Sequence, residues 1–101
     1  MSDTVTTAKP ETRTKPERPK LWKVILLNDD FTPQDFVVVV LRSIFRMTSD
    51  QARGVMMTAH QKGACVVALY TREVAEDKAK AGTEAGSASG FPLTFTTERD
   101  D

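Results

Sequence analysis

The residues best suited to chemistry are three consecutive hydrogen-bond acceptors, Asn28, Asp29 and Asp30, which directly follow the apolar run "LWKVILL" at 21–27. Along an extended chain neighbouring side chains point to opposite faces, so we expect Asn28 and Asp30 on one face and Asp29 on the other. Two acceptors that converge can hold a positively charged ligand. Asn and Asp also favour turns, because their side chains bond to their own backbone. The triplet therefore predicts either a turn or a cation-binding corner.

The triplet does not fit a metal site. A calcium-binding loop of the EF-hand type needs glycine at its sixth position and a bidentate glutamate at its twelfth. Counted from any of the three residues, the twelfth position is valine or leucine and the sixth is never glycine. With one histidine and one cysteine in the chain, a transition-metal site is not expected either. We expect no metal and no cofactor.

Nucleophilic catalysis would have to pair Cys65 with His60. A helix end and a turn are expected between the two, and no third group is evident to orient the histidine. Cys65 lies in an apolar run, where cysteine acts as a small buried hydrophobe. For His60 and Met56 the ordinary explanations are a solvent-facing histidine near a helix end and a core methionine. We therefore expect no catalytic residues and no enzymatic activity.

Length and charge restrict the class of protein further. The chain has 101 residues, with 14 Lys and Arg against 14 Asp and Glu. A core of about eighty residues buries only about 60–65% of its unfolded surface, which allows a shallow groove rather than a deep active site. The zero net charge argues against a nucleic-acid partner. No signal peptide or membrane span is recognisable, so we expect a cytoplasmic protein that does not bind a membrane.

The chain divides into a tail at 1–20 and one domain at 21–101. The tail holds three prolines, many charges and no aromatic residue, a composition typical of a disordered segment. The first strand is expected at 21–27. A first helix is expected to about residue 46, with Thr32 as its cap, Pro33 at its first position and Asp35 reaching back to the cap.

The second half of the domain has equally clear boundaries. Thr48 and Gln51 form a capping pattern that begins a second helix, and Gly63 ends it. A strand at 64–70 follows, and then a third helix capped by Thr71, which we expect to fray near its glycines before Gly90 closes it. The last strand is expected at 92–97. The fold class is α+β with the order β-α-α-β-α-β: a small three-stranded antiparallel sheet with three helices packed on one face.

Four stretches of this sequence closely resemble the ClpS family of N-degron adaptor proteins. They are "WKVILLNDDFTPQDFVVVVL", "MMTAHQKG", "YTREVAEDKA" and "FPLTFTTE". They occur in the family's order, and the resemblance spans roughly residues 21–98. The specific part is the combination of Asn-Asp-Asp-x-Thr-Pro, a helix that ends in x-x-His-x-x-Gly, and Pro-Leu in the last strand. A lone Asn-Asp-Asp would not be specific.

The resemblance implies recognition rather than reaction. Members of the family bind the free α-amino group and the large hydrophobic side chain of a protein that begins with Phe, Tyr, Trp or Leu. They deliver that protein to a ClpA- or ClpC-type AAA+ unfoldase for proteolysis. The resemblance implies the same function here, in a chain that we expect to be monomeric.

The family's functional positions carry over to three groups of residues. The group that matches the α-amino site is Asn28, Asp29, Asp30 and His60. The group that matches the hydrophobic pocket is Thr32, Val37, Met56 and Leu93, with Gln34 and Ala59 at its entrance and rim. The group that matches the contact with the unfoldase is Glu73 and Lys78.

Two of these positions depart from the family's usual residues. Gln34 stands where methionine is usual, and Ala59 stands where a larger aliphatic residue is common. The preference among first residues therefore stays open, and the chain resembles a divergent second paralogue. The alternative function is an interaction domain that modulates the unfoldase and has a vestigial or altered pocket.

Overall fold

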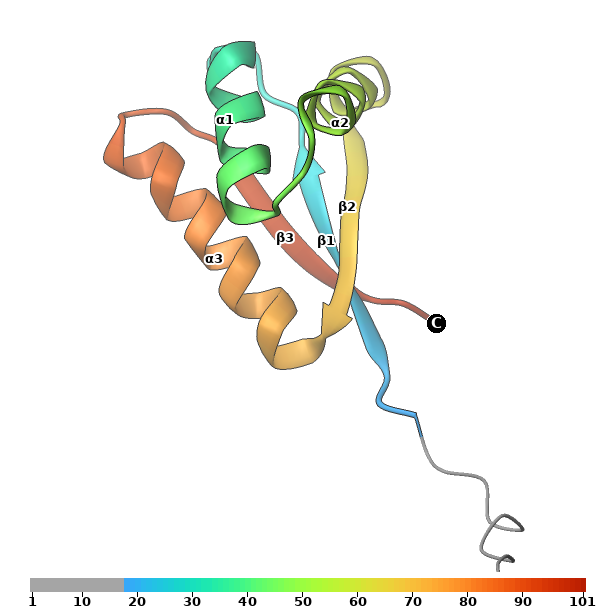
Figure 1. The fold of residues 1–101 in the computed structure, drawn as a ribbon. Helices are drawn as coiled ribbons and strands as arrows, with labels where there is room; N and C mark the ends of the chain where they lie inside the picture. Colours follow the sequence, from blue (N-terminus) through green and yellow to red (C-terminus); the bar gives the residue numbers. More distant parts are fainter. Residues whose placement is uncertain (1–17) are drawn as a thin grey trace, which may run out of the picture.

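A computed structural model of the protein describes residues 18–101 (Figure 1). Its elements are β1 (Leu21–Leu27), α1 (Gln34–Ile44), α2 (Ser49–Lys62), β2 (Ala64–Thr71), α3 (Arg72–Ala88) and β3 (Thr94–Arg99). The predicted order β-α-α-β-α-β is confirmed. Most of the predicted tail, residues 1–17, lies outside the described residues, and residues 18–20 carry no regular structure. No helix within 18–101 is long and apolar enough to cross a membrane.

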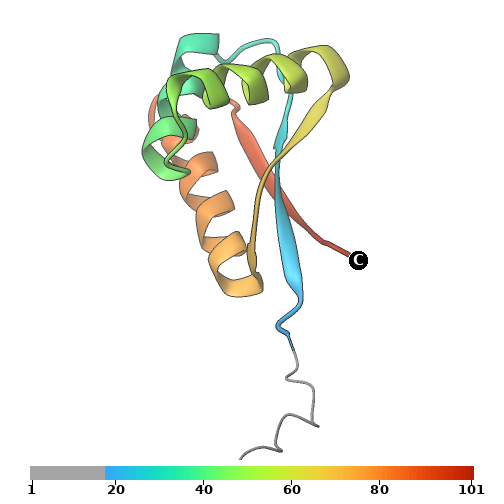
Figure 2. The ribbon, with the colours of Figure 1, turned by 45° about the vertical axis from the view of Figure 1, so that its right-hand side comes forward.

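The sheet has the strand order β2-β1-β3, and β1 pairs antiparallel with both neighbours. The three helices lie on one side of it (Figures 1 and 2). Inward-facing Val24 and Leu26 of the central strand are almost fully buried beneath them. The side chains of the central strand thus alternate between the core and the other face of the sheet.

Helix α1 begins one residue later than predicted. Its cap is Pro33, whose side chain makes no capping hydrogen bond, so the predicted cap at Thr32 is wrong. The Thr32 hydroxyl instead donates to Oδ2 of Asp29. The helix ends at Ile44 rather than near residue 46, where Arg46 takes a left-handed conformation with φ of 58°. Burial of three of the four consecutive valines compensates for their low helix propensity.

Helix α2 has the predicted ends. The Thr48 hydroxyl accepts the backbone N–H of Gln51, and the Gln51 side chain accepts the N–H of Thr48, so the capping box is complete. Gly63 follows the helix with φ of 93°, a conformation that favours glycine. The Gly63 carbonyl oxygen accepts the backbone N–H of Asn28 at 3.0 Å. This bond joins the end of α2 to the end of β1.

Helix α3 does not fray at its glycines, contrary to the prediction, but runs unbroken to Ala88. A β-carbon at Gly82 would lie 2.5 Å from the Phe95 ring, and one at Gly86 would lie 2.6 Å from Cβ of Leu93. The glycines thus allow the segment around β3 to pack closely against the helix. The side chain of Thr71 makes no capping bond, and β3 begins at Thr94 rather than at residue 92. Pro92, which has no N–H, and buried Leu93 precede the strand.

Candidate functional site

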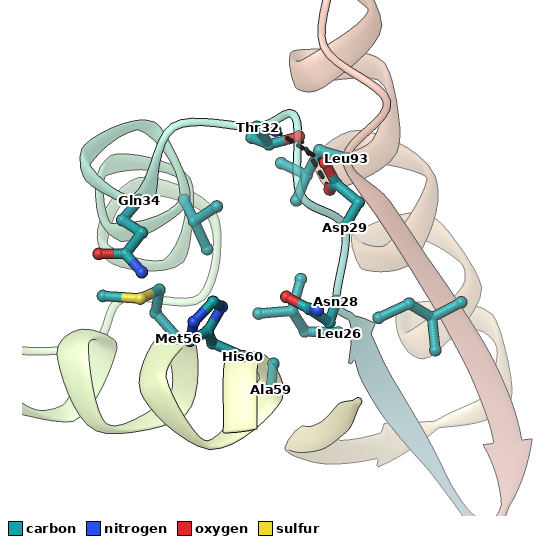
Figure 3. A pocket seen from close by; sticks show the side chains of 11 residues that line it. Leu26, Asn28, Asp29, Thr32, Gln34, Met56, Ala59, His60 and Leu93 are labelled. Carbon is teal, nitrogen blue, oxygen red and sulfur yellow. Dashed lines mark hydrogen bonds between the residues drawn. The ribbon is translucent and has the colours of Figure 1, made fainter. Parts of the chain in front are cut away.

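A cavity lies where the end of β1, the start of α1, the last turns of α2 and the segment before β3 come together (Figure 3). Its volume is ≈ 30 Å³, and it opens to solvent on one side. That is room for ordered water, which an entering side chain can displace. The lining residues are Leu26, Leu27, Asn28, Asp29, Thr32, Gln34, Val37, Met56, Ala59, His60 and Leu93.

The floor and walls of the cavity are apolar. Val37, Met56, Ala59 and Leu93 are all buried and come from three separate segments of the chain. Thr32 is the one buried polar residue within 18–101, at 7% exposure, and its hydroxyl is already hydrogen-bonded. The lining therefore offers an apolar environment of the kind that binds hydrocarbon side chains.

Two exposed polar side chains stand at the opening. Asn28 directly follows β1, and the bond from its N–H to Gly63 fixes its backbone beside the end of α2. His60 projects from the last turn of the same helix. Figure 3 shows the Asn28 amide and the His60 ring directed at the same opening. An amide oxygen and a neutral imidazole nitrogen both accept hydrogen bonds, so together they suit a ligand with several donors.

Asp29 shapes the loop between β1 and α1. Its Oδ1 accepts the backbone N–H groups of Phe31 at 2.9 Å and Thr32 at 2.7 Å, and its Oδ2 accepts the Thr32 hydroxyl at 2.9 Å. Asp29 is thus the centre of an Asx turn. The turn that the sequence analysis offered as one alternative is therefore present. The triplet also borders the cavity, and the cation-binding corner stays a prediction.

The cavity does not take in the whole triplet. Asn28 and Asp29 both line the cavity, whereas exposed Asp30 does not. The strand ends at Leu27, and Asp30 begins the bend that leads to α1.

Sequence reasoning missed Leu26 and Leu27 as lining residues. Both immediately precede Asn28 in the strand, and this proximity was the available signal. Gln34 is the first residue of α1 and is exposed, and Figure 3 shows its amide near the Met56 thioether. A polar group therefore stands at the entrance to an otherwise apolar cavity.

The two residues expected to contact an unfoldase lie on α3, away from the cavity. Glu73 is exposed in the first turn of this helix. The Lys78 ammonium donates to the carbonyl oxygen of Ile44 at 2.7 Å and lies 6.0 Å from the centre of the Tyr70 ring. Lys78 thus caps the C-terminus of α1, a structural role that the sequence did not indicate.

Cys65 lies in β2 and does not line the cavity with His60. Burial raises the pKa of its thiol, and this effect outweighs a hydrogen bond with Thr58 and the charge of Lys62, which both lower it. The thiol is therefore poorly suited to act as a nucleophile. No group of three or more potential metal ligands occurs within 18–101.

The sequence profile of the family described as "ATP-dependent Clp protease adaptor protein ClpS" matches residues 17–96. The chain is 60% identical to the ClpS 1 adapter of Bradyrhizobium diazoefficiens over 101 residues, which cover the whole of both chains. It is 58% identical to the ClpS 2 adapter of Mesorhizobium japonicum, over 94% of this chain and 96% of that one.

A solved structure is similar as well. Agrobacterium tumefaciens ClpS2 bound to L-phenylalaninamide superposes with a TM-score of 0.81 at 58% identity, covering 82% of this chain and 100% of that one. The profile match spans most of the chain, and the relatives align over nearly their full length. The chain therefore belongs to the ClpS family and is an adaptor of the ATP-dependent Clp protease rather than an enzyme.

Proposed function

We propose that the protein binds the free N-terminal residue of substrates that begin with a large hydrophobic amino acid, and delivers them in the cytoplasm to a ClpA- or ClpC-type unfoldase. The observation that carries this proposal is a cavity that combines apolar walls with the acceptors of Asn28 and His60 at its opening. The related ClpS2 binds L-phenylalaninamide, a molecule with a free α-amino group, a phenyl ring and a neutral amide in place of a continuing chain.

The polar end of the site suits an α-ammonium group. This group has three N–H donors and a positive charge, and therefore needs several acceptors and a nearby negative charge. Asn28 and His60 supply neutral acceptors, and we expect the exposed carboxylate of Asp30, two residues after Asn28, to supply the negative charge. An acetylated N-terminus has no charge and fewer donors, so it would leave these acceptors desolvated without a partner.

The apolar end of the site suits one side chain. Burying a Leu or Phe side chain contributes about 1.5–3 kcal/mol, and Val37, Met56 and Leu93 provide the surface for it. Gln34 at the entrance adds a hydrogen-bonding amide, which would favour a side chain with a polar tip such as Tyr or Trp over Leu. Small Ala59 leaves more space at the rim than a larger aliphatic residue would.

Delivery requires a second surface. Glu73 and Lys78 lie on α3 and leave the cavity accessible. An adaptor that holds substrate and unfoldase at once raises the effective concentration of the substrate at the unfoldase. Affinity for each partner can then be modest.

The proposal is tested with decapeptides that differ only at their N-terminus, titrated by fluorescence anisotropy. Free Phe, Tyr, Trp or Leu should bind, and acetylated or Gly-extended versions of the same peptides should not. Replacement of His60 by alanine should weaken binding about tenfold or more, as expected for a lost hydrogen bond to a charged group. Gln61→Ala is the matched control, because exposed Gln61 adjoins His60 but does not line the cavity.

Two results would contradict the proposal. Equal binding of free and acetylated peptides would remove the role of the α-amino group. Binding of an unfoldase without binding of any peptide would favour the alternative, a modulating domain with a vestigial pocket. A Gln34→Met variant on the same panel of peptides measures how far this position sets the preference among first residues.

A further inference from the structure

We propose that Asp29 is a positioning residue of this site, which holds the loop at 28–33 in its binding shape and does not itself pair with the substrate's amino group. The inference rests on the proposed function and deepens it. It gives the three residues after β1 different roles. The side chains of Asn28 and Asp30 are available to the ligand, whereas the Asp29 carboxylate accepts hydrogen bonds from the protein's own backbone.

The hydrogen bonds of Asp29 support this division. Its carboxylate accepts three donors, two backbone N–H groups and one hydroxyl, at 2.7–2.9 Å. A carboxylate has about four lone-pair sites, so most of its capacity is used. Figure 3 shows the group turned toward Thr32, whereas the Asn28 amide and the His60 ring are directed at the opening.

The side chains on either side of Asp29 are different. Within residues 18–101, no hydrogen bond or ion pair involves the side chain of Asn28 or Asp30. Both side chains are exposed. Their acceptors are therefore free to meet a ligand at no cost in internal hydrogen bonds.

The turn also controls the apolar wall. Its bonds fix the backbone of Phe31 and Thr32, and Thr32 lines the cavity two residues before Gln34. The ring of Phe31 is 80% exposed, so packing of this side chain does not hold the loop. Loss of the turn should therefore disturb both the amino-group end and the wall of the site.

The first experiment needs no peptide. Amide hydrogen exchange at Phe31 and Thr32 is measured by NMR in the unaltered protein and in Asp29→Asn and Asp29→Ala. An asparagine oxygen can accept the same two N–H groups, so Asp29→Asn should keep both amides protected, and Asp29→Ala should speed their exchange about tenfold or more. Fast exchange in the unaltered protein would overturn the inference.

The second experiment measures affinity for a peptide with free N-terminal Phe. Asp29→Asn should stay within about threefold of the unaltered protein, and Asp29→Ala and Asp30→Asn should each bind about tenfold more weakly or worse. If Asp29→Asn binds as weakly as Asp29→Ala while its amides remain protected, the charge of Asp29 pairs with the ligand and the inference is wrong. If the unaltered protein binds no peptide, the proposed function fails instead, and the exchange experiment still decides the role of Asp29 in the turn.

Discussion

The proposed contact of His60 with an ammonium group would make binding depend on pH. Its ring nitrogen can accept a hydrogen bond only when the imidazole is neutral, and a protonated imidazole repels a cation. Imidazoles take up a proton between about pH 5 and 8, whereas a peptide's α-amino group stays charged below about pH 7.5. Lowering the pH far enough to protonate an imidazole should therefore weaken the binding of a peptide with a free N-terminus.

Fluorescence anisotropy at several pH values measures this effect. A His60→Gln variant is the matched control, because its amide oxygen accepts a hydrogen bond but does not titrate in this range. Its affinity should change little with pH. An unchanged affinity of the unaltered protein across the same range would exclude the proposed contact between His60 and the amino group.

Cys65 should prove chemically inert in the folded protein. Burial raises the pKa of its thiol, so less of the reactive thiolate is present near pH 8 than in the unfolded chain. Its reaction with a disulfide reagent should be slower in the native protein than in denaturant. Cys65→Ala should cost only about 1 kcal/mol of stability and leave peptide affinity unchanged, and a loss of binding would revive a role for the thiol in the site.

The sequence predicted residue types at the site better than their directions. The resemblance to the ClpS family supplied nearly all the lining residues, whereas the residue pattern by itself singled out only the polar triplet. Neither could show which carboxylate is engaged in a turn. That depends on the hydrogen bonds that the N–H groups of Phe31 and Thr32 donate to Asp29, which only the folded backbone reveals.

At the level of helices and strands, the accuracy of each predicted boundary depended on which contacts define it. The capping box of α2 was predictable because Thr48 and Gln51 satisfy one another across three residues. The start of α1 was not, because Thr32 has an alternative partner in Asp29. The continuity of α3 through its glycines was missed for a related reason: their packing partners, Phe95 and Leu93, lie beyond the helix in the sequence.

Gly86 connects the packing of α3 with the cavity. An added β-carbon would lie 2.6 Å from Cβ of Leu93, which is a lining residue, and 3.3 Å from the Phe91 carbonyl oxygen. Gly86→Ala should therefore lower the free energy of unfolding by about 2 kcal/mol, through overpacking. It should also weaken peptide binding, because Leu93 has to move.

Gly54→Ala is the control for this substitution. Gly54 lies within α2, and a β-carbon there would have no neighbour within 4 Å. Alanine should stabilise the protein by about 0.5–1 kcal/mol through its higher helix propensity. Urea denaturation and peptide titration of both variants test the argument, and equal stability of the two would show that α3 can shift to accept the methyl group.

On the scale of the whole molecule, α3 runs from the surface around Glu73, the proposed contact with an unfoldase, toward the cavity. Glu73 is in its first turn, and Leu93 lies just beyond its end, beside the cavity. A helix of 17 residues is roughly 25 Å long, at about 1.5 Å per residue. Figure 1 shows α1 and α2 gathered toward the end of the molecule away from the start of α3. The cavity and exposed Glu73 therefore lie toward opposite ends of α3, as the proposed simultaneous binding of substrate and unfoldase requires.

Deletion of residues 1–17 should separate substrate binding from delivery. Every residue that lines the cavity lies at position 26 or later, so the truncated protein should bind a peptide with free N-terminal Phe within about twofold of the full chain. The deleted segment is rich in proline, threonine and charged residues, and we expect an unfoldase to engage it. Without this segment, degradation of a substrate that begins with Phe should therefore slow markedly. Anisotropy measures the first effect, and an assay with unfoldase, peptidase and ATP measures the second.

A Glu73→Lys variant provides the comparison, because it alters the α3 surface alone and should also slow degradation without changing peptide affinity. Undiminished degradation by the truncated protein would assign delivery to the folded domain by itself.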